Sequence, residues 1–137
     1  MPDDAGNERQ AVLDTVHAFL DTIPRKDVEG MRALLVPGGS IVRSRDGETI
    51  CTPMMEFPDL MPARPGAREE LFYRPTVLID DDIAMVWTRY DFLVDGELHH
   101  WGTNIFSLLK RDGRWRLSAI ADNGRTSPRP DGWETGD

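Results

Sequence analysis

Three of the four Asp-Gly dipeptides, those at residues 46–47, 95–96 and 112–113, constrain the fold of this chain more than any other feature. Each lies between two segments in which apolar and polar residues alternate, and Asp-Gly in that position is a strong signal of a β-hairpin. Turns this tight force the strands that they join to run antiparallel. The sequence therefore predicts a chain dominated by β-hairpins.

The alternation predicts about six strands. Two short strands are expected within residues 40–52, and four longer ones at residues 68–79, 83–94, 97–109 and 114–122. The intervening segment, residues 53–66, is rich in proline and methionine, which excludes a long regular element. We interpret this segment as an ordered flap with a deformable apolar surface.

The N-terminal part of the chain has a helical period instead. Asn7 and Gln10 have the spacing of a capping box, and apolar residues recur at helical intervals from Val12 to Ile23. Pro24 is expected to end this helix, and Asp27 to cap a second, shorter one that stops at a Pro-Gly-Gly sequence. The two helices form a hairpin with one apolar side.

These elements predict an α+β fold in which N-terminal helices cover a curved antiparallel sheet. The chain has 137 residues, the length of one domain, and we assign residues 1–123 to it. Residues 124–137 are rich in Gly, Pro and charge and are expected to form a flexible tail. Trp133 is the exception there: it could dock on the domain, although we expect it to be exposed.

Composition excludes several classes of partner. The formal charge of −8 repels nucleic acid and anionic membrane surfaces. The single cysteine, Cys51, cannot form an internal disulfide, and no Cys and His cluster has the spacing of a zinc site. The N-terminus is acidic and no apolar run is long enough to cross a bilayer, so we expect a cytoplasmic protein without metal or cofactor.

The hairpin at residues 95–96 predicts which side chains share a face of the sheet. A two-residue turn places Asp91 opposite His100, and the side that they share also holds Trp87, Arg89 and Asn104. A carboxylate, a guanidinium, an imidazole and an amide beside an indole are typical of a small-molecule pocket. A bulge near the turn would exchange the two faces.

Two longer segments carry a resemblance to a known superfamily. They are AVLDTVHAFLDTIPRKDVEGMRALL and DIAMVWTRYDFLVDGELHHWGTNIFSLLKRDGRWRLSAIAD, the second with the pattern His100-x-Gly102-x-Asn104-x-Phe106 before a DGRW turn. Over roughly residues 8–123 the chain resembles the nuclear transport factor 2-like superfamily, and within it the SnoaL-like proteins. The superfamily includes ketosteroid isomerases, scytalone dehydratase and polyketide cyclases. The resemblance implies a cone-shaped fold with a central cavity.

The match to ketosteroid isomerase is incomplete. Asn104 falls at the position of the acid that holds the oxyanion, but Phe19 replaces the helix-one tyrosine and Arg43 or a neighbour replaces the general base. We therefore do not expect a ketosteroid isomerase. In the dehydratase and cyclase relatives a His and Asp pair does the acid–base work, and the equivalent pair here is His100 and Asp91.

The resulting interpretation is a pocket for a hydrophobic, oxygenated small molecule. We expect a cofactor-free isomerase, dehydratase or cyclase that transfers a proton on a carbonyl-bearing substrate, with His100 as base or acid and Asp91 as its orienting partner. The residues expected to bind the substrate are Arg89, Asn104, Trp87, Phe19 and Met55. A non-catalytic ligand-binding module and a dimeric assembly module stay open as alternatives.

The other face of the sheet is expected to carry Tyr90, Phe92 and Trp101. Large exposed apolar patches usually mark contacts with another protein. We therefore expect a homodimer through this face, and superfamily members that pair through their sheets imply the same arrangement.

Overall fold

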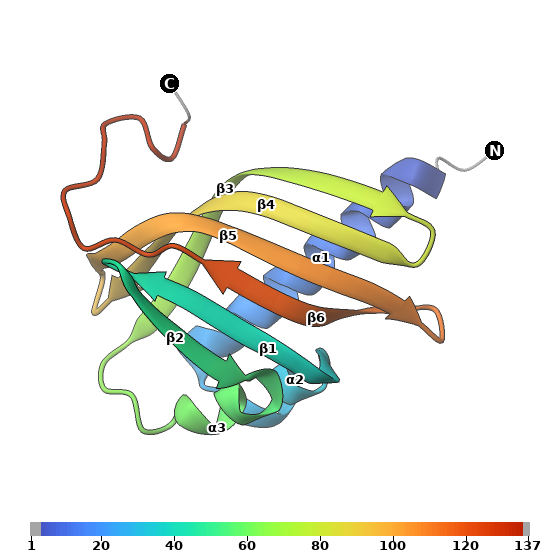
Figure 1. Ribbon diagram of the computed structural model, residues 1–137, viewed down its shortest axis with the longest axis horizontal. Coiled ribbons are helices and arrows are strands. Elements are labelled where there is room, and N and C mark those ends of the chain that lie inside the picture. The colour runs from blue at the N-terminus through green and yellow to red at the C-terminus, as the bar shows by residue number, and fades with distance from the viewer. Residues whose placement is uncertain (1–3, 136–137) are drawn as a thin grey trace.

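The structure of residues 4–135, a computed structural model, has helices at the N-terminus and a six-stranded sheet (Figure 1). The helices are α1 (Asp4–Arg25), α2 (Val28–Arg32) and α3 (Phe57–Leu60), the last preceded by the 3₁₀ turn η1 (Met54–Glu56). The strands are β1 (Leu35–Arg45), β2 (Glu48–Pro53), β3 (Arg68–Asp80), β4 (Ile83–Val94), β5 (Glu97–Arg111) and β6 (Arg114–Asp122). The predicted α+β class is confirmed.

The strands are arranged in the order β2-β1-β6-β5-β4-β3. Every neighbouring pair is antiparallel except β1 and β6, which run parallel, so the sheet is mixed and the prediction of a wholly antiparallel sheet is wrong at this contact. No hairpin joins β1 to β6, and only a hairpin turn dictates an antiparallel direction.

The Asp-Gly dipeptides at residues 46–47, 95–96 and 112–113 form the predicted turns. Both residues of each have positive φ: 49° and 90° at residues 46–47, 53° and 80° at 95–96, and 54° and 74° at 112–113. Two positive φ values define the type I′ turn, whose twist matches that of the flanking strands. These turns fix the hairpins β1–β2, β4–β5 and β5–β6.

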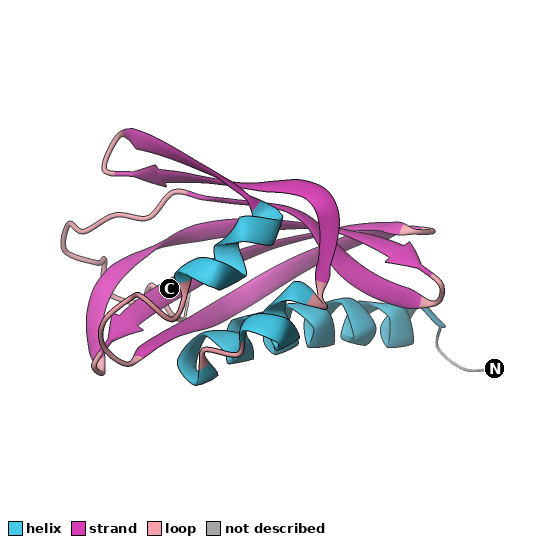
Figure 2. Ribbon diagram, turned by 90° about the horizontal axis from the view of Figure 1, so that it is seen from below, coloured by secondary structure: helices cyan, strands magenta, loops and turns pink. Residues whose placement is uncertain are grey.

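Helix α1 lies along one face of the curved sheet (Figure 2). Its apolar stripe is buried against the strands and consists of Val12, Leu13, Val16, Phe19, Leu20 and Ile23. The helix begins at Asp4, so Asn7 lies inside it rather than at its cap, and Pro24 lies in its last turn. Asp27 does cap α2, because its Oδ1 accepts a hydrogen bond from the Gly30 amide at 2.9 Å.

Helix α2 is shorter than predicted, because the Pro-Gly-Gly sequence lies inside β1. Gly39 passes close to β6, where a Cβ atom would stand 2.2 Å from the Ser118 carbonyl oxygen. Only glycine permits this approach of two backbones.

Bulges shift the register in the middle of the sheet. Phe92 pairs with His100 but Leu93 pairs with Leu98, which leaves His99 as an extra residue of β5. Such a bulge exchanges the faces of the two strands. The predicted register at residues 95–96 is therefore correct at the turn and wrong beyond it.

A second bulge affects the last hairpin. Leu108 pairs with Leu117 whereas Ser107 pairs with Ala119, so Ser118 is the extra residue. Beyond this point Asp122 lies opposite Asn104 and faces the same side of the sheet.

The C-terminal segment leaves β6, runs past the start of β5 and loops beside that end of the sheet (Figure 1). Arg125 pairs with Trp101 through two backbone hydrogen bonds, and the Trp101 indole donates to the Ser127 carbonyl at 2.7 Å. The ring of Trp133 meets that of Trp101 edge to face, with centroids 4.9 Å apart. Instead of standing free, the expected tail covers an otherwise exposed tryptophan, and only its residues 136 and 137 lie outside the described chain.

Candidate functional site

A cavity of about 210 Å³ lies between α1 and the curved sheet. Its apolar walls are Phe19, Ile23, Ile41, Phe57, Phe92, Phe106 and Ile120, and its polar lining consists of Arg43, Arg45, Arg64, Arg68, Glu70, His99, His100, Asn104 and Asp122. An apolar pocket with a few convergent polar groups is the usual form of a small-molecule site. The flap supplies Phe57 and Arg64, so it borders the cavity as expected.

Glu70, on β3, is the most perturbed carboxyl group of the cavity. Asn104 on β5 donates a hydrogen bond from Nδ2 to the Glu70 Oε2 at 2.6 Å. Burial raises the pKa of Glu70 to about 8, while the Asn104 hydrogen bond opposes this rise only in part. A carboxyl group with such a pKa is mostly protonated at neutral pH.

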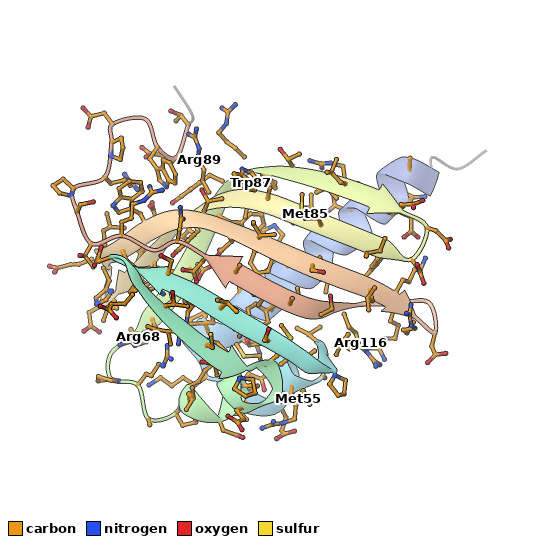
Figure 3. All side chains as sticks on the ribbon, viewed as in Figure 1. Met55, Arg68, Met85, Trp87, Arg89 and Arg116 are labelled. Atoms are coloured by element: carbon orange, nitrogen blue, oxygen red, sulfur yellow. The ribbon has the colours of Figure 1, made fainter. Side chains whose placement is uncertain are left out.

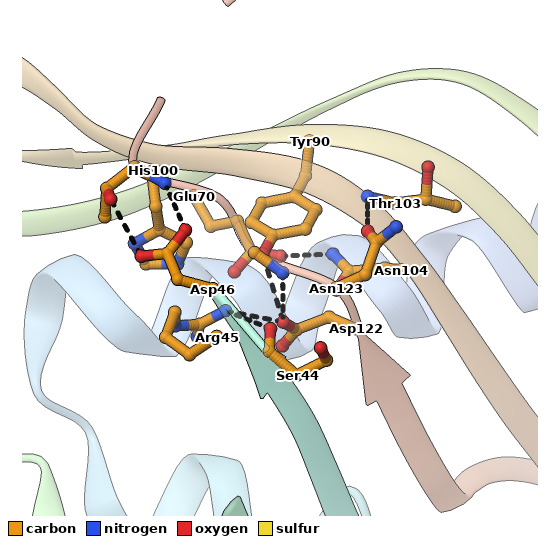
Figure 4. A network of polar contacts seen from close by, with 12 residues as sticks. Ser44, Arg45, Asp46, Glu70, Tyr90, His100, Thr103, Asn104, Asp122 and Asn123 are labelled. Atoms are coloured by element: carbon orange, nitrogen blue, oxygen red, sulfur yellow. Dashed lines mark hydrogen bonds and ion pairs between the residues drawn. The ribbon is translucent and has the colours of Figure 1, made fainter. Parts of the chain in front are cut away.

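Asp122 is held in a different environment at the end of β6 (Figure 4). Its Oδ1 accepts hydrogen bonds from the Tyr90 hydroxyl at 3.1 Å and the Gly124 amide at 3.1 Å, and pairs with Arg45 Nη1 at 2.7 Å. These donors suit an ionised carboxylate. The two carboxyl groups of the cavity lining thus have different partners: Glu70 accepts from an amide, and Asp122 lies in an ion pair with Arg45.

The contacts with Asp122 change the pKa values of Tyr90 and Arg45. Burial, together with the charge of Asp122, raises the pKa of Tyr90 above its usual value, so the phenol keeps its proton. Burial lowers the pKa of Arg45, but its ion pair with Asp122 outweighs this effect and raises the pKa overall. Both groups therefore have one fixed protonation state at neutral pH.

His100 lies in the cavity as a neutral imidazole. Burial, followed by the positive charge of Arg45 and the neighbouring His99, lowers the pKa of His100 to about 3. The His100 ring stacks on Phe92 with centroids 4.7 Å apart, and its Nδ1 is 2.9 Å from Nδ1 of His99. An imidazole with this pKa is a weak base.

The cavity is strongly cationic. Four guanidinium groups line it, and among the described residues only that of Arg45 has a carboxylate partner within the cavity. The Nε of Arg43 is buried and has no hydrogen-bond partner among the described residues. Burial and the charges of the other arginines lower the pKa values of Arg43 and Arg64.

Three of the residues predicted from sequence line the cavity. They are Phe19, His100 and Asn104. With the His99 bulge, the His100 and Asn104 side chains of β5 still point inward, as predicted. The side chains of β4 beyond the bulge point to the face opposite to the predicted one. Tyr90 and Phe92, which were expected outside, consequently face α1 and the cavity, and both are buried.

The β4 residues expected in the pocket lie on the outer face instead (Figure 3). Trp87 is 49% exposed, and Arg89 donates to the Trp133 carbonyl at 3.0 Å. Asp91 is buried under the C-terminal segment, where its Oδ2 accepts from the Tyr73 hydroxyl at 2.9 Å and from Arg129. Asp91 therefore does not pair with His100, and the predicted orienting contact is absent.

Met55 does not line the cavity either. It belongs to η1 and packs against the hydrophobic core, while its carbonyl accepts a hydrogen bond from Arg32 at 2.7 Å. Within the flap, the residue that reaches the cavity from α3 is Phe57.

Sequence reasoning missed the carboxyl groups and most of the arginines. Two pairs of charged residues lie two positions apart, Arg68 and Glu70 in β3 and Arg43 and Arg45 in β1. Because side chains alternate along a strand, both members of a pair point to the same side. Charged residues at a spacing of two inside predicted strands were the available signal. Asp122 could not be found in this way, because the Ser118 bulge determines its direction.

The described residues contain neither a metal-ligand cluster nor a membrane-spanning helix. Across residues 4–135, no three His, Cys, Asp or Glu side chains are grouped so that they could hold a metal ion. Within the same part of the chain, no helix has the length and apolar character needed to cross a membrane.

Solved structures of similar fold support this architecture. A protein of unknown function from Mycobacterium tuberculosis superposes with a TM-score of 0.75 at 19% identity, covering 97% of this chain and 79% of the other. The beta subunit of a putative aromatic-ring-hydroxylating dioxygenase from Novosphingobium aromaticivorans also gives 0.75, at 14% identity and 97% and 99% coverage. A putative dehydratase of the NTF2-like family from Streptomyces avermitilis gives 0.73, at 14% identity and 91% and 99% coverage.

At these identities the structural matches establish the fold alone. No curated protein matches the chain. The model of the family described as putative lumazine-binding, however, matches residues 7–119, which is most of the chain. The chain belongs to this lumazine-binding-like family, and its fold is the one shared by the NTF2-like proteins of known structure, as the resemblance of its sequence indicated.

Proposed function

We propose that the protein binds a small carbonyl compound in this cavity and transfers a proton at the carbon next to the carbonyl, with Glu70 as the acid–base group. The observation that carries the proposal is the hydrogen bond between Glu70 and Asn104 on the cavity wall. It places one proton-transferring group beside apolar walls that exclude water. The reaction class is that of a cofactor-free isomerase, dehydratase or cyclase.

The proton transfer requires no redox partner. The ionised form of Glu70, the minor form at neutral pH, takes a proton from the carbon. The C–H bonding electrons move towards the carbonyl oxygen, and an enolate forms. Protonated Glu70 then returns the proton to carbon, which restores the carboxylate. A carboxyl group with a pKa near 8 is a stronger base than an ordinary glutamate, and Asn104 orients it.

The surroundings of Glu70 support this role. The guanidinium groups of Arg43 and Arg45 supply a positive field that stabilises an enolate oxygen. His100 is neutral and Tyr90 is protonated, so neither adds a negative charge to the site. We assign His100, Asn104 and Phe19 to contacts with the bound molecule, and the acid–base role to Glu70 instead of the expected His100 and Asp91 pair.

Hydrogen exchange tests this proposal without knowledge of the natural substrate. Cyclohexanone and a cyclohexanone that carries a ring carboxylate are incubated in D₂O, and loss of the proton signal beside the carbonyl is followed by NMR. The wild-type protein should accelerate exchange of at least one ketone. E70Q should abolish the acceleration, while E69Q, on the exposed neighbouring residue, should retain it. Unchanged exchange by E70Q, or no acceleration of either ketone, would contradict the proposal.

A second candidate function is ligand binding without catalysis. The family description names lumazine, a flat heterocycle, and the cavity has the flat ring of Phe57 in its wall. A fluorescence titration with lumazine, beside the exchange assay, separates the two functions. Saturable binding of lumazine without exchange of either ketone would favour the second.

We further propose that the protein acts as a homodimer in the cytoplasm. The outer face carries apolar residues that the C-terminal segment leaves exposed, among them Leu78, Ile83 and Trp87. They replace the expected patch, since Tyr90 and Phe92 face inward and Trp101 is covered. Light scattering after size exclusion should give a dimer for the wild type and a monomer for W87D; a wild-type monomer would contradict this pairing.

A further inference from the structure

The positive charge of the cavity is unusual for this chain. The protein has a formal charge of −8, yet four arginines line one cavity. Asp122 is paired with Arg45, and Glu70 is mostly protonated at neutral pH. The cavity therefore keeps an excess of positive charge that the described residues do not neutralise, and confined charges of one sign repel one another.

Arg43, Arg64 and Arg68 form the part of this cluster that has no carboxylate partner among the described residues, and the first two share an aromatic neighbour. The Cζ atoms of these two lie over the Phe57 ring, 5.7 and 5.3 Å from its centroid. A cation–π contact uses the flat face of a guanidinium and leaves its N–H edge free. For Arg43 the consequence is visible, because its buried Nε–H has no acceptor among the described residues.

A buried donor without an acceptor is destabilising, and proteins rarely keep one. Replacing Arg43 by an apolar residue would remove the unpaired donor together with the mutual repulsion. An acceptor supplied by the bound molecule explains why the donor is kept. The acceptor must carry negative charge to balance the guanidinium groups, and its body must be apolar to fit the phenylalanine and isoleucine walls.

We propose that the ligand is a small organic anion whose carboxylate is held by Arg43 and Arg64, with its apolar body inside the cavity. This inference rests on the same cavity as the proposed function and names its substrate class, a keto acid. A planar carboxylate has two oxygens that match the paired N–H groups of guanidinium. The volume of about 210 Å³ restricts the body to a small one, since pockets for drug-sized ligands measure about 300–1,000 Å³.

Calorimetric titration with benzoate tests the inference directly. Benzyl alcohol, the matched neutral probe, should bind at least about tenfold more weakly than benzoate, because it cannot offset the cationic cluster. R64Q and R43Q should each weaken benzoate binding about tenfold. R114Q, on an exposed arginine in the β5–β6 hairpin, should leave it unchanged.

Several results would overturn the inference. They are equal affinities for benzoate and benzyl alcohol, no detectable binding of benzoate, or benzoate binding that is unchanged in R64Q. Tighter binding of phenyl phosphate than of benzoate would show that the site prefers a phosphate group to a carboxylate. R64Q keeps the test available if R43Q fails to fold, because Arg64 lies in the loop after α3 rather than in the sheet.

The same titration separates this inference from the proposed function. Glu70 is mostly neutral at pH 7, so E70Q should keep the affinity for benzoate while it loses ketone exchange. Benzoate binding without exchange in the wild type would leave the ligand class standing and remove the catalytic role. Exchange of cyclohexanone, together with equal affinities for benzoate and benzyl alcohol, would support the catalytic role and contradict the proposed ligand class.

Discussion

Phe92 lies directly opposite His100 across β4 and β5, and their rings stack with an interplanar angle of 13° and centroids 4.7 Å apart. The stack covers one face of the imidazole with hydrocarbon, and Tyr90 meets its ring edge-on at 5.7 Å. Water is therefore kept from the ring, and a protonated imidazole would lie among arginines. Both effects favour the neutral form of His100.

The first prediction concerns stability in acid. The pKa of His100 is about 3 in the folded protein and about 6.5 when unfolded, so the unfolded chain binds more protons between these values. The histidine therefore removes stability as pH falls through that window, by up to about 1.4 kcal/mol per pH unit. H100F keeps an aromatic stack and should lack this loss, which urea unfolding at pH 4.5–6.5 measures. Parallel pH profiles for H100F and the wild type would contradict the prediction.

The second prediction concerns Glu70, whose effect has the opposite sign. Its folded pKa of about 8 lies above the ordinary value of 4.5, so the folded protein binds more protons between them. Stability should fall as pH rises through this window, by up to about 1.4 kcal/mol per pH unit. Between pH 7 and 8 His100 is mostly neutral in both states, so E70Q should flatten the profile there. If the slope of stability against pH persisted in E70Q and disappeared in E69Q, Glu70 would not be its source and the prediction would be wrong.

The third prediction concerns the ion pair of Asp122. The side chains of Arg45 and Asp122 are only 20% and 10% exposed, so D122N leaves a mostly buried guanidinium without its partner. We expect the free energy of unfolding to fall by about 2–3 kcal/mol, somewhat below the loss for a fully buried pair. The matched control is D82N, which breaks the exposed pair of Asp82 with Arg111 and should cost at most about 1 kcal/mol. Equal losses for both variants would show that burial of the Asp122 pair has no effect.

The fourth prediction concerns the C-terminal segment. Trp133 packs on Trp101, lies 4.7 Å from the Arg89 guanidinium and donates to the Tyr90 carbonyl at 3.2 Å. W133A should lower the free energy of unfolding by about 1–2 kcal/mol, less than for a fully buried tryptophan. It should also shift tryptophan emission to longer wavelength as Trp101 becomes exposed. L60A, at a half-exposed leucine of α3 that lies outside this contact, should stay within about 0.5 kcal/mol of the wild type. Unchanged stability of W133A would mean that the segment does not hold to the sheet.

The sequence could predict the elements because their signals are local. The Asp-Gly turns, the helical stripe of α1 and the Asp27 cap each depend on residues within a few positions of one another. The parallel contact of β1 with β6 depends instead on how distant segments meet, and no local pattern records it.

The candidate site was predicted less well because one extra residue decides it. His99 has no feature that marks a bulge, yet it reverses the β4 side chains from Ile83 to Phe92 relative to the predicted register with β5. His100 and Asn104 line the cavity as predicted, whereas Trp87, Arg89 and Asp91 lie on the outer face. The same reversal buried Tyr90 and Phe92, which had been assigned to a dimer interface.

The most direct test of the account is the titration of Glu70 itself, followed through the NMR signal of its ¹³C-labelled side-chain carboxyl carbon. E70Q identifies the signal by its absence. The account predicts a midpoint near pH 8, with the carboxyl group mostly protonated at neutral pH. A midpoint near 4.5 would contradict it, because Glu70 would then be an ordinary ionised glutamate that neutralises the arginines of the cavity.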